Sequence, residues 1–260
     1  MELRESGIAE IDFGEVVHVR TAVAAPTALV ICEHASRRIP AGMGTMGLDE
    51  DALNSHIAWD PGAASVAEGV AARLGATLVK GGVSRLVYDC NRPPEAPSAI
   101  PEQSEVFAIP ANRRLGERER AQRIDSVYEP FRQAVAAEIT RHRASLNLMI
   151  TIHSFTPVFA GRTRDVEIGL LHGRDASFAT AMQRFAPLEA PYDVRLNEPY
   201  AADDGVTHTL DLHGAANGLA SVMVEIRNDL IATDADQRAM SDHLADWIEA
   251  TRGANGNERA

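Results

Sequence analysis

The sequence predicts an α/β protein built on a mostly parallel sheet flanked by helices. Short apolar runs, typical of buried strands, alternate with longer segments of helical periodicity. The order β-α-β favours parallel strands joined by crossover helices. Four of the apolar runs end in a compact polar group, and ligands of open α/β sheets bind just beyond the carboxyl ends of the strands. These runs cover residues 29–36, 84–92, 148–155 and 221–229.

In the first half of the chain, the clearest helix covers residues 63–74, where apolar residues recur at helical spacing behind Asp60-Pro61-Gly62. Residues 77–80 and 85–88 are predicted to form strands around a Gly-Gly turn. The stretch 93–110 is rich in Pro, Glu, Ser and Ala and shows no periodicity. Loops of this length in compact domains are often lids or binding loops.

The second half continues the same alternation. Residues 117–143 carry one apolar stripe among many charges, which predicts an amphipathic helix or helix pair. Further strands are expected at 166–172 and 194–196, with helices near 176–186 and 235–251.

Composition restricts the classes of protein that fit. A chain of 260 residues with 45% hydrophobic content buries a sizeable core, so we expect one domain over residues 1–252 and a disordered tail at 253–260. The net charge of −12 argues against nucleic acid or an anionic membrane as partner. No apolar run approaches the roughly 20 residues of a membrane span, and no signal-peptide pattern begins the chain, so we expect a cytoplasmic protein. A homo-oligomer remains an open alternative.

The two cysteines, Cys32 and Cys90, each lie inside an apolar run. Buried thiols in a reducing compartment explain them best, with a metal-ligand role as the alternative.

Two histidines, His34 and His153, end separate apolar runs at the junction of strand and loop. One such histidine is typical of a structural hydrogen bond, whereas two indicate a zinc site, which also needs a carboxylate. Asp60 is the best third ligand because the Pro-Gly turn that follows would present it, although an ordinary helix N-cap fits equally well. Glu33 is less suitable, since successive strand residues point to opposite faces, but it could support a ligand from outside.

A charged residue, Glu225, lies within a buried run, where it is costly unless it is paired or used. Alternation places Glu225 and Arg227 on one face, so an internal ion pair is one interpretation. The other is that Glu225 moves a proton from the attacking water to a leaving amine.

The run at 84–92 ends in a polar group that includes Asp89, Asn91 and Arg92, with Arg85 near its start. The arginines offer planar donors that match carboxylates, and Asp89 and Asn91 could orient them. Groups of this composition are also common in surface turns.

Six motifs in register, CEHASRRIP, WDPGA, SRLVYDCNRP, TIHSFTP, NEPY and MVEIRNDLI, resemble the N-formylglutamate amidohydrolase family, in particular its predicted, less characterised bacterial branch, over about residues 28–232. The resemblance implies a three-layer α/β/α sandwich with a mostly parallel sheet, of zinc-exopeptidase or phosphorylase/hydrolase type. It also implies zinc, or another divalent metal, on His34, Asp60 and His153, with Glu225 as the catalyst. Glu33 departs from the family pattern, where some members have proline.

By this resemblance, the expected reaction is hydrolysis of a small acidic N-acyl amino acid, most simply N-formyl-L-glutamate to formate and L-glutamate, in histidine degradation. We expect Arg85, Arg92 and Arg227 to hold substrate carboxylates. Four further residues either complete the pocket or serve only as loop hydrogen-bonders and caps: Asn197, Tyr200, His208 and His213. Two alternatives remain: a zinc amidase for another amide, such as a peptidoglycan fragment or other N-acyl amino acid, and a metal-free binding module for acidic ligands.

Overall fold

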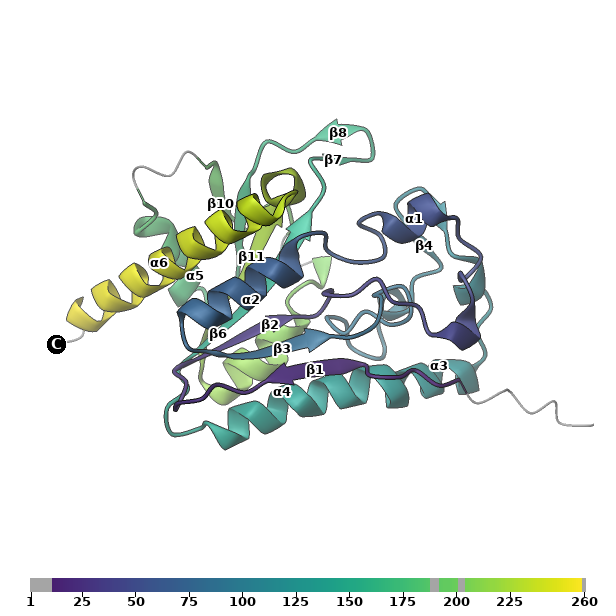
Figure 1. Ribbon diagram of the computed structural model, residues 1–260, viewed down its shortest axis with the longest axis horizontal. Helices are drawn as coiled ribbons and strands as arrows, with labels where there is room; N and C mark the ends of the chain where they lie inside the picture. Colours follow the sequence, from purple (N-terminus) through teal and green to yellow (C-terminus); the bar gives the residue numbers. More distant parts are fainter. Residues whose placement is uncertain (1–10, 188–191, 201–203, 259–260) are drawn as a thin grey trace, which may run out of the picture.

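A seven-stranded, mostly parallel sheet forms the centre of the molecule, in a computed structural model that describes residues 11–187, 192–200 and 204–258 (Figure 1). The edge strand β1 runs antiparallel to β3, and β9 runs antiparallel to β11; the other neighbouring pairs are parallel. In sheet order the strands are β1 (Val17–Arg20), β3 (Thr77–Gly81), β2 (Ala28–Cys32), β6 (Leu148–Phe155), β11 (Ala220–Arg227), β9 (Ile168–Leu171) and β10 (Val194–Leu196). The predicted α/β class is confirmed.

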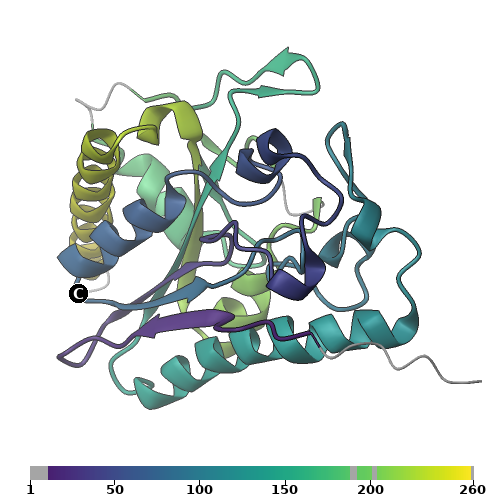
Figure 2. The same cartoon turned by 45° about the vertical axis from the view of Figure 1, so that its right-hand side comes forward.

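Helices cover both faces of the sheet and complete three layers (Figures 1 and 2). One face carries α2 (Ala63–Arg73), α5 (Ser177–Arg184) and α6 (Asp234–Glu258), and the other carries α3 (Glu117–Arg123) and α4 (Glu129–Arg141). Because strand side chains alternate between faces, Ile150 and Ile152 join the core under α2 and α6, whereas Met149 and Met223 join the opposite core.

Smaller elements decorate this frame. The helix α1 (Glu50–Asn54) and two hairpins, β4–β5 (Gln103–Ser104, Phe107–Ala108) and β7–β8 (Val158–Phe159, Arg162–Thr163), lie outside the main sheet (Figure 1). Two π-helical turns occupy Ile124–Tyr128 and Leu210–Gly214, and 3₁₀ turns occupy Ala41–Met43, Pro97–Ala99, Pro110–Asn112, Ala215–Asn217 and Asn228–Ile231. No helix in the described part of the chain is both long enough and apolar enough to cross a bilayer.

One predicted strand is wrong. Residues 85–88 form a turn, in which Val87 N donates to Ser84 O at 2.9 Å and Leu86 N donates to Ser84 Oγ at 3.1 Å. Leu86 and Val87 are nevertheless fully buried in one of the two cores. Their apolar character reflects packing, which a turn can provide as well as a strand, so only three of the four polar-ended runs are strand ends.

Two other differences concern segments without a clear pattern in the sequence. The predicted loop at 93–110 contains the hairpin β4–β5 and 3₁₀ turns. The helix α6 extends past residue 251 to Glu258, so it takes in most of the segment 253–260 for which we predicted a disordered tail. The extent of the single domain, 1–252, stays a prediction.

Candidate active site

The central strands bring three of the predicted site residues together. The strands β2, β6 and β11 are parallel neighbours, so their carboxyl ends meet at one edge of the sheet. His153 and Glu225 are direct partners in the β6–β11 ladder. Strand alternation also puts Glu33 on the face of Ile31, the same face as His153, and His34 follows one residue later.

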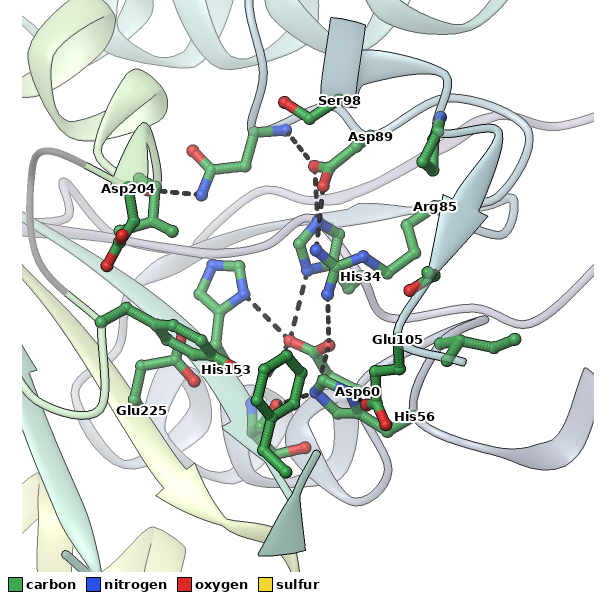
Figure 3. A pocket seen from close by; sticks show the side chains of 18 of the residues that line it. His34, His56, Asp60, Arg85, Asp89, Ser98, Glu105, His153, Asp204 and Glu225 are labelled. Carbon is green, nitrogen blue, oxygen red and sulfur yellow. Dashed lines mark hydrogen bonds and ion pairs between the residues drawn. The ribbon is translucent and has the colours of Figure 1, made fainter. Parts of the chain in front are cut away.

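Asp60 reaches this cluster from the loop before α2. Its backbone N donates to His34 O at 3.0 Å, and its side-chain Oδ2 lies 2.9 Å from His153 Nδ1 and 3.3 Å from His34 Nδ1 (Figure 3). The N-cap of α2 is Gly62, at φ +80°, with no side-chain cap, so the N-cap interpretation of Asp60 is wrong. One ligand atom from each of His34, Asp60 and His153 lies within 4.8 Å of the others, and all three residues are buried.

The outer nitrogens of both imidazoles contact carboxylates. His34 Nε2 lies 2.7 Å from Asp89 Oδ1, and His153 Nε2 lies 3.0 Å from Glu33 Oε2. Histidines that ligate metals are typically oriented by an outer carboxylate in this way. Each ring therefore turns its Nδ1 toward the centre of the cluster. Glu33 lies outside the cluster, in the supporting position that the sequence suggested for it.

The cluster carries an excess of negative charge. Burial opposes ionisation of Glu33, Asp60 and Asp89, but the neighbouring imidazoles lower the pKa of all three carboxyl groups. Arg85 donates to Asp89 Oδ2 at 2.9 Å and to Asp60 Oδ1 at 3.3 Å. One guanidinium against three carboxylates leaves two negative charges for the rest of the cluster to balance.

Without a bound cation, protons on the imidazoles balance that charge. Burial lowers the pKa of His153 and His34, but the facing carboxylates outweigh burial and raise both pKa values, that of His153 strongly. A divalent ion on neutral imidazoles supplies the same two positive charges. Two imidazoles and one carboxylate are also the donor set of many catalytic zinc sites, so the residues present fit the metal that the sequence predicted.

Glu225 has an unsatisfied carboxylate oxygen beside the histidine cluster. It is buried, and no described residue hydrogen-bonds to its Oε2. Burial raises its pKa from 4.5 to about 7, although His153 acts in the opposite direction. A carboxyl group with this pKa can both accept and return a proton near neutral pH.

A cavity of about 580 Å³ opens onto this cluster (Figure 3). The predicted site residues that line it are His34, Asp60, Arg85, Asp89, Asn91, Arg92, His153, Tyr200 and Glu225. Within this set Asn91 also holds backbone: its Nδ2 donates to Val206 O at 2.6 Å, and its Oδ1 accepts from Thr209 N at 3.0 Å.

Arg227 does not line the cavity. Its guanidinium donates to Asp229 Oδ1 at 2.8 Å and to Glu167 Oε1 at 3.2 Å. Both predicted roles, the substrate contact and the ion pair with Glu225, are therefore corrected: nearer carboxylates beyond the strand end hold this side chain.

Three more predicted pocket residues lie elsewhere. Asn197 holds His172, accepting from its backbone N at 3.1 Å, and His208 Nε2 lies 2.9 Å from Tyr128 Oη. His213 is buried in a π-helical turn, and burial lowers its pKa to about 4. These three side chains serve packing and local hydrogen bonding, the alternative that the sequence had left open.

Sequence reasoning missed several residues of the cavity wall. His56 Nε2 donates to Ser154 O at 2.8 Å, and Arg164 and Phe159 come from the region of β7–β8. Ser98 and Glu105 belong to the aperiodic stretch 93–110, so the loop signal pointed to the right segment without identifying the residues. Arg164 had no strand end or motif to mark it.

Comparison with known proteins agrees with this fold. The family model for N-formylglutamate amidohydrolase matches residues 27–232, so the chain belongs to that family. The crystal structure of gene product Atu2144 from Agrobacterium tumefaciens is 48% identical, with a TM-score of 0.91 over 94% of this chain and 97% of that one. The N-formylglutamate amidohydrolase from Ralstonia eutropha JMP134 shares the fold at 17% identity, with a TM-score of 0.68 over 92% of this chain and 99% of that one. No sequence among curated proteins matches the chain significantly.

Proposed function

We propose that the protein is a metal-dependent hydrolase that cleaves the amide bond of a small acidic N-acyl amino acid, with N-formyl-L-glutamate as the substrate and formate and L-glutamate as products. The observation that carries the proposal is the convergence of His34, Asp60 and His153 beside the buried acid Glu225 in one cavity. Family membership supports the amide as the bond that is cleaved.

Zinc, or another divalent cation, would be held by His34, Asp60 and His153. When bound, such an ion polarises the acyl oxygen and lowers the pKa of water. Asp89 orients His34 through a hydrogen bond at 2.7 Å, and Glu33 supports His153 from outside as a charged neighbour 3.0 Å from Nε2.

Glu225 supplies proton transfer in this proposal. Its carboxylate takes a proton from the attacking water and delivers it to the amide nitrogen as the C–N bond breaks, so that the amine leaves uncharged. Burial raises the pKa of this carboxyl group above its ordinary value, which favours return of the proton to the amide nitrogen. The unpaired Oε2 can face the water without giving up another hydrogen bond.

Arg92 is the better placed of the two predicted arginines to bind a substrate carboxylate. Arg85 already donates to Asp60 and Asp89, whereas Arg92 lines the cavity and donates to Asn91 O at 2.9 Å, with no carboxylate partner in the described parts of the chain. Tyr200 adds a hydroxyl to the same wall.

The test is turnover by zinc-loaded protein with N-formyl-L-glutamate, followed as formate release, beside the same protein after chelation. Turnover that disappears on chelation and returns with zinc supports the proposal. If the loaded protein hydrolyses no N-acyl amino acid, the proposal fails; ligand binding without metal content would then favour the binding module.

A second candidate follows from the size of the cavity. Its volume of about 580 Å³ lies in the range of pockets for drug-sized ligands, which are larger than N-formylglutamate. A longer N-acyl amino acid or a peptidoglycan fragment therefore belongs in the same substrate panel. The cytoplasmic location and the part in histidine degradation stay predictions.

A further inference from the structure

Arg164 occupies an unusual position in the cavity wall, among three aromatic rings. Its guanidinium carbon lies 4.5 Å from the ring centroid of Phe159, 4.9 Å from that of Tyr200 and 5.6 Å from that of Phe155. Stacking of this kind fixes the plane of a guanidinium and shields its faces from water. The donors that point outward in that plane remain available.

The hydrogen bonds of Arg164 use only one of its nitrogens. Nη1 donates to Tyr200 Oη at 3.2 Å and to Thr156 O at 3.5 Å. Across the described residues, Nε and Nη2 have no acceptor and no carboxylate forms an ion pair with this side chain. One edge of the guanidinium is therefore open for a bidentate contact with a carboxylate.

The three arginines that line the cavity differ in how their charge is balanced. Arg85 is paired with two aspartates, whereas Arg92 and Arg164 each line the cavity without a carboxylate partner in the part of the chain that the structure describes. They come from different segments, one from the turn region after β3 and one from the strand exit after β7–β8. Two such groups in one cavity fit a ligand with two carboxylates better than a ligand with one.

We propose that Arg164 determines specificity for an acidic side chain, by binding the second carboxylate of a dicarboxylic N-acyl amino acid while Arg92 binds the first. This assignment rests on the proposed function and names the residue that separates glutamate-like from neutral substrates. The three rings hold the guanidinium in place before substrate arrives, which lowers the entropy lost when the contact forms.

The test compares Arg164→Met with the unmodified zinc-loaded protein on N-formyl-L-glutamate and N-formyl-L-glutamine, which differ in charge but hardly in shape. The variant should lower kcat/KM for the glutamate derivative about 10- to 100-fold, because a charge-assisted bidentate contact is lost, and change the glutamine derivative little. The kcat/KM of Arg164→Lys for the glutamate derivative should lie between those of the unmodified protein and Arg164→Met, since lysine keeps the charge and loses the two parallel N–H donors. Arg162→Met is the control, because it removes an exposed arginine of β8 that lies outside the cavity wall. It should leave kcat/KM for both substrates unchanged.

Calorimetric binding of L-glutamate and L-glutamine to the same proteins separates this assignment from the proposed function. The unmodified protein could turn over neither substrate and still bind L-glutamate more tightly than L-glutamine. If Arg164→Met then removes that difference in affinity, the proposed reaction is wrong but the role of Arg164 in recognising the acidic side chain stands. The assignment is overturned if the folded Met and Lys variants keep the unmodified preference in rate and binding. It is equally overturned if the unmodified protein does not prefer the acidic ligand in either measurement.

Discussion

Replacing Glu225 with glutamine should make the protein a much poorer enzyme and, above neutral pH, a more stable one. The amide keeps the size of the side chain but cannot take up a proton. General acid–base catalysis contributes about 10²- to 10⁴-fold, so turnover should fall by that factor while the metal content is unchanged. Since Oε2 has no hydrogen-bond partner in the described chain, the substitution breaks no contact at that atom.

The gain in stability follows from the raised pKa. A glutamate that ionises at 4.5 when unfolded and at about 7 when folded opposes folding as the pH rises between those values, and the cost is complete above pH 7. The difference corresponds to about 3 kcal/mol. Glutamine carries no such cost, so the variant should gain up to that amount at pH 8 and nothing at pH 4. At roughly 2–4 °C per kcal/mol for a chain of this size, its Tm should rise by up to about 6–12 °C at pH 8.

The measurement is thermal unfolding of the variant and the unmodified protein at pH 4 and pH 8. Both proteins are first stripped of metal by a chelator, because a nearby cation would itself lower the pKa of Glu225. Formate release and elemental analysis on the zinc-loaded variant complete the set. Loss of zinc from the variant would indicate that Glu225 is itself a metal ligand. A variant with normal turnover, or with no stabilisation at pH 8 relative to pH 4, would refute the assignment of a buried catalytic acid.

Three further changes test the rest of the site. Asp89→Asn weakens the carboxylate that orients His34, so zinc affinity should fall about 10- to 100-fold in competition with a coloured chelator; unchanged affinity would exclude the supporting role. Arg92→Met should raise KM for N-formyl-L-glutamate about 10-fold or more through loss of a charge-assisted contact, and an unchanged KM would remove Arg92 from the substrate site. Chelated protein should lose stability as the pH rises above about 6.5, because His34 and His153 have raised pKa values in the folded state and their contribution disappears as they deprotonate. Zinc-loaded protein should not show that decline in Tm between pH 6.5 and 9. If Tm falls with pH equally in the chelated and the zinc-loaded protein, the metal does not bind these imidazoles.

The parts of the site that the sequence predicted lie where strand periodicity is informative. His153 and Glu225 are inside long buried strands, where a polar residue needs a reason, and His34 follows a third. Parallel strands then place these residues together without further information. The same reasoning placed the α/β class correctly, because it depends on alternation of elements and not on their exact ends.

The errors arise where contacts between distant segments decide the outcome. Arg227 continues the alternation of Glu225, but Glu167 and Asp229 hold it outside the cavity, and neither contact is visible in a local pattern. Arg164 was missed for the converse reason, since its place depends on three rings from β6, β7 and the segment near Tyr200. The apolar run at 84–92 reads as a strand because burial, and not strand geometry, sets its composition.

The buried charges of the site connect stability to function. Three ionised carboxylates and one guanidinium beneath a cavity are expensive to bury unless positive charge completes the set. Protons on His34 and His153 do so in the metal-free protein, and in the proposed metal site a divalent cation would do so without them. In the proposed site, each proton that the cation displaces would free an Nδ1 lone pair beside Asp60, so binding of the metal would also prepare the imidazoles as ligands. A protein with this arrangement should therefore bind its metal more tightly as the pH rises and release protons on binding, and calorimetry in buffers of different ionisation enthalpy would detect their number.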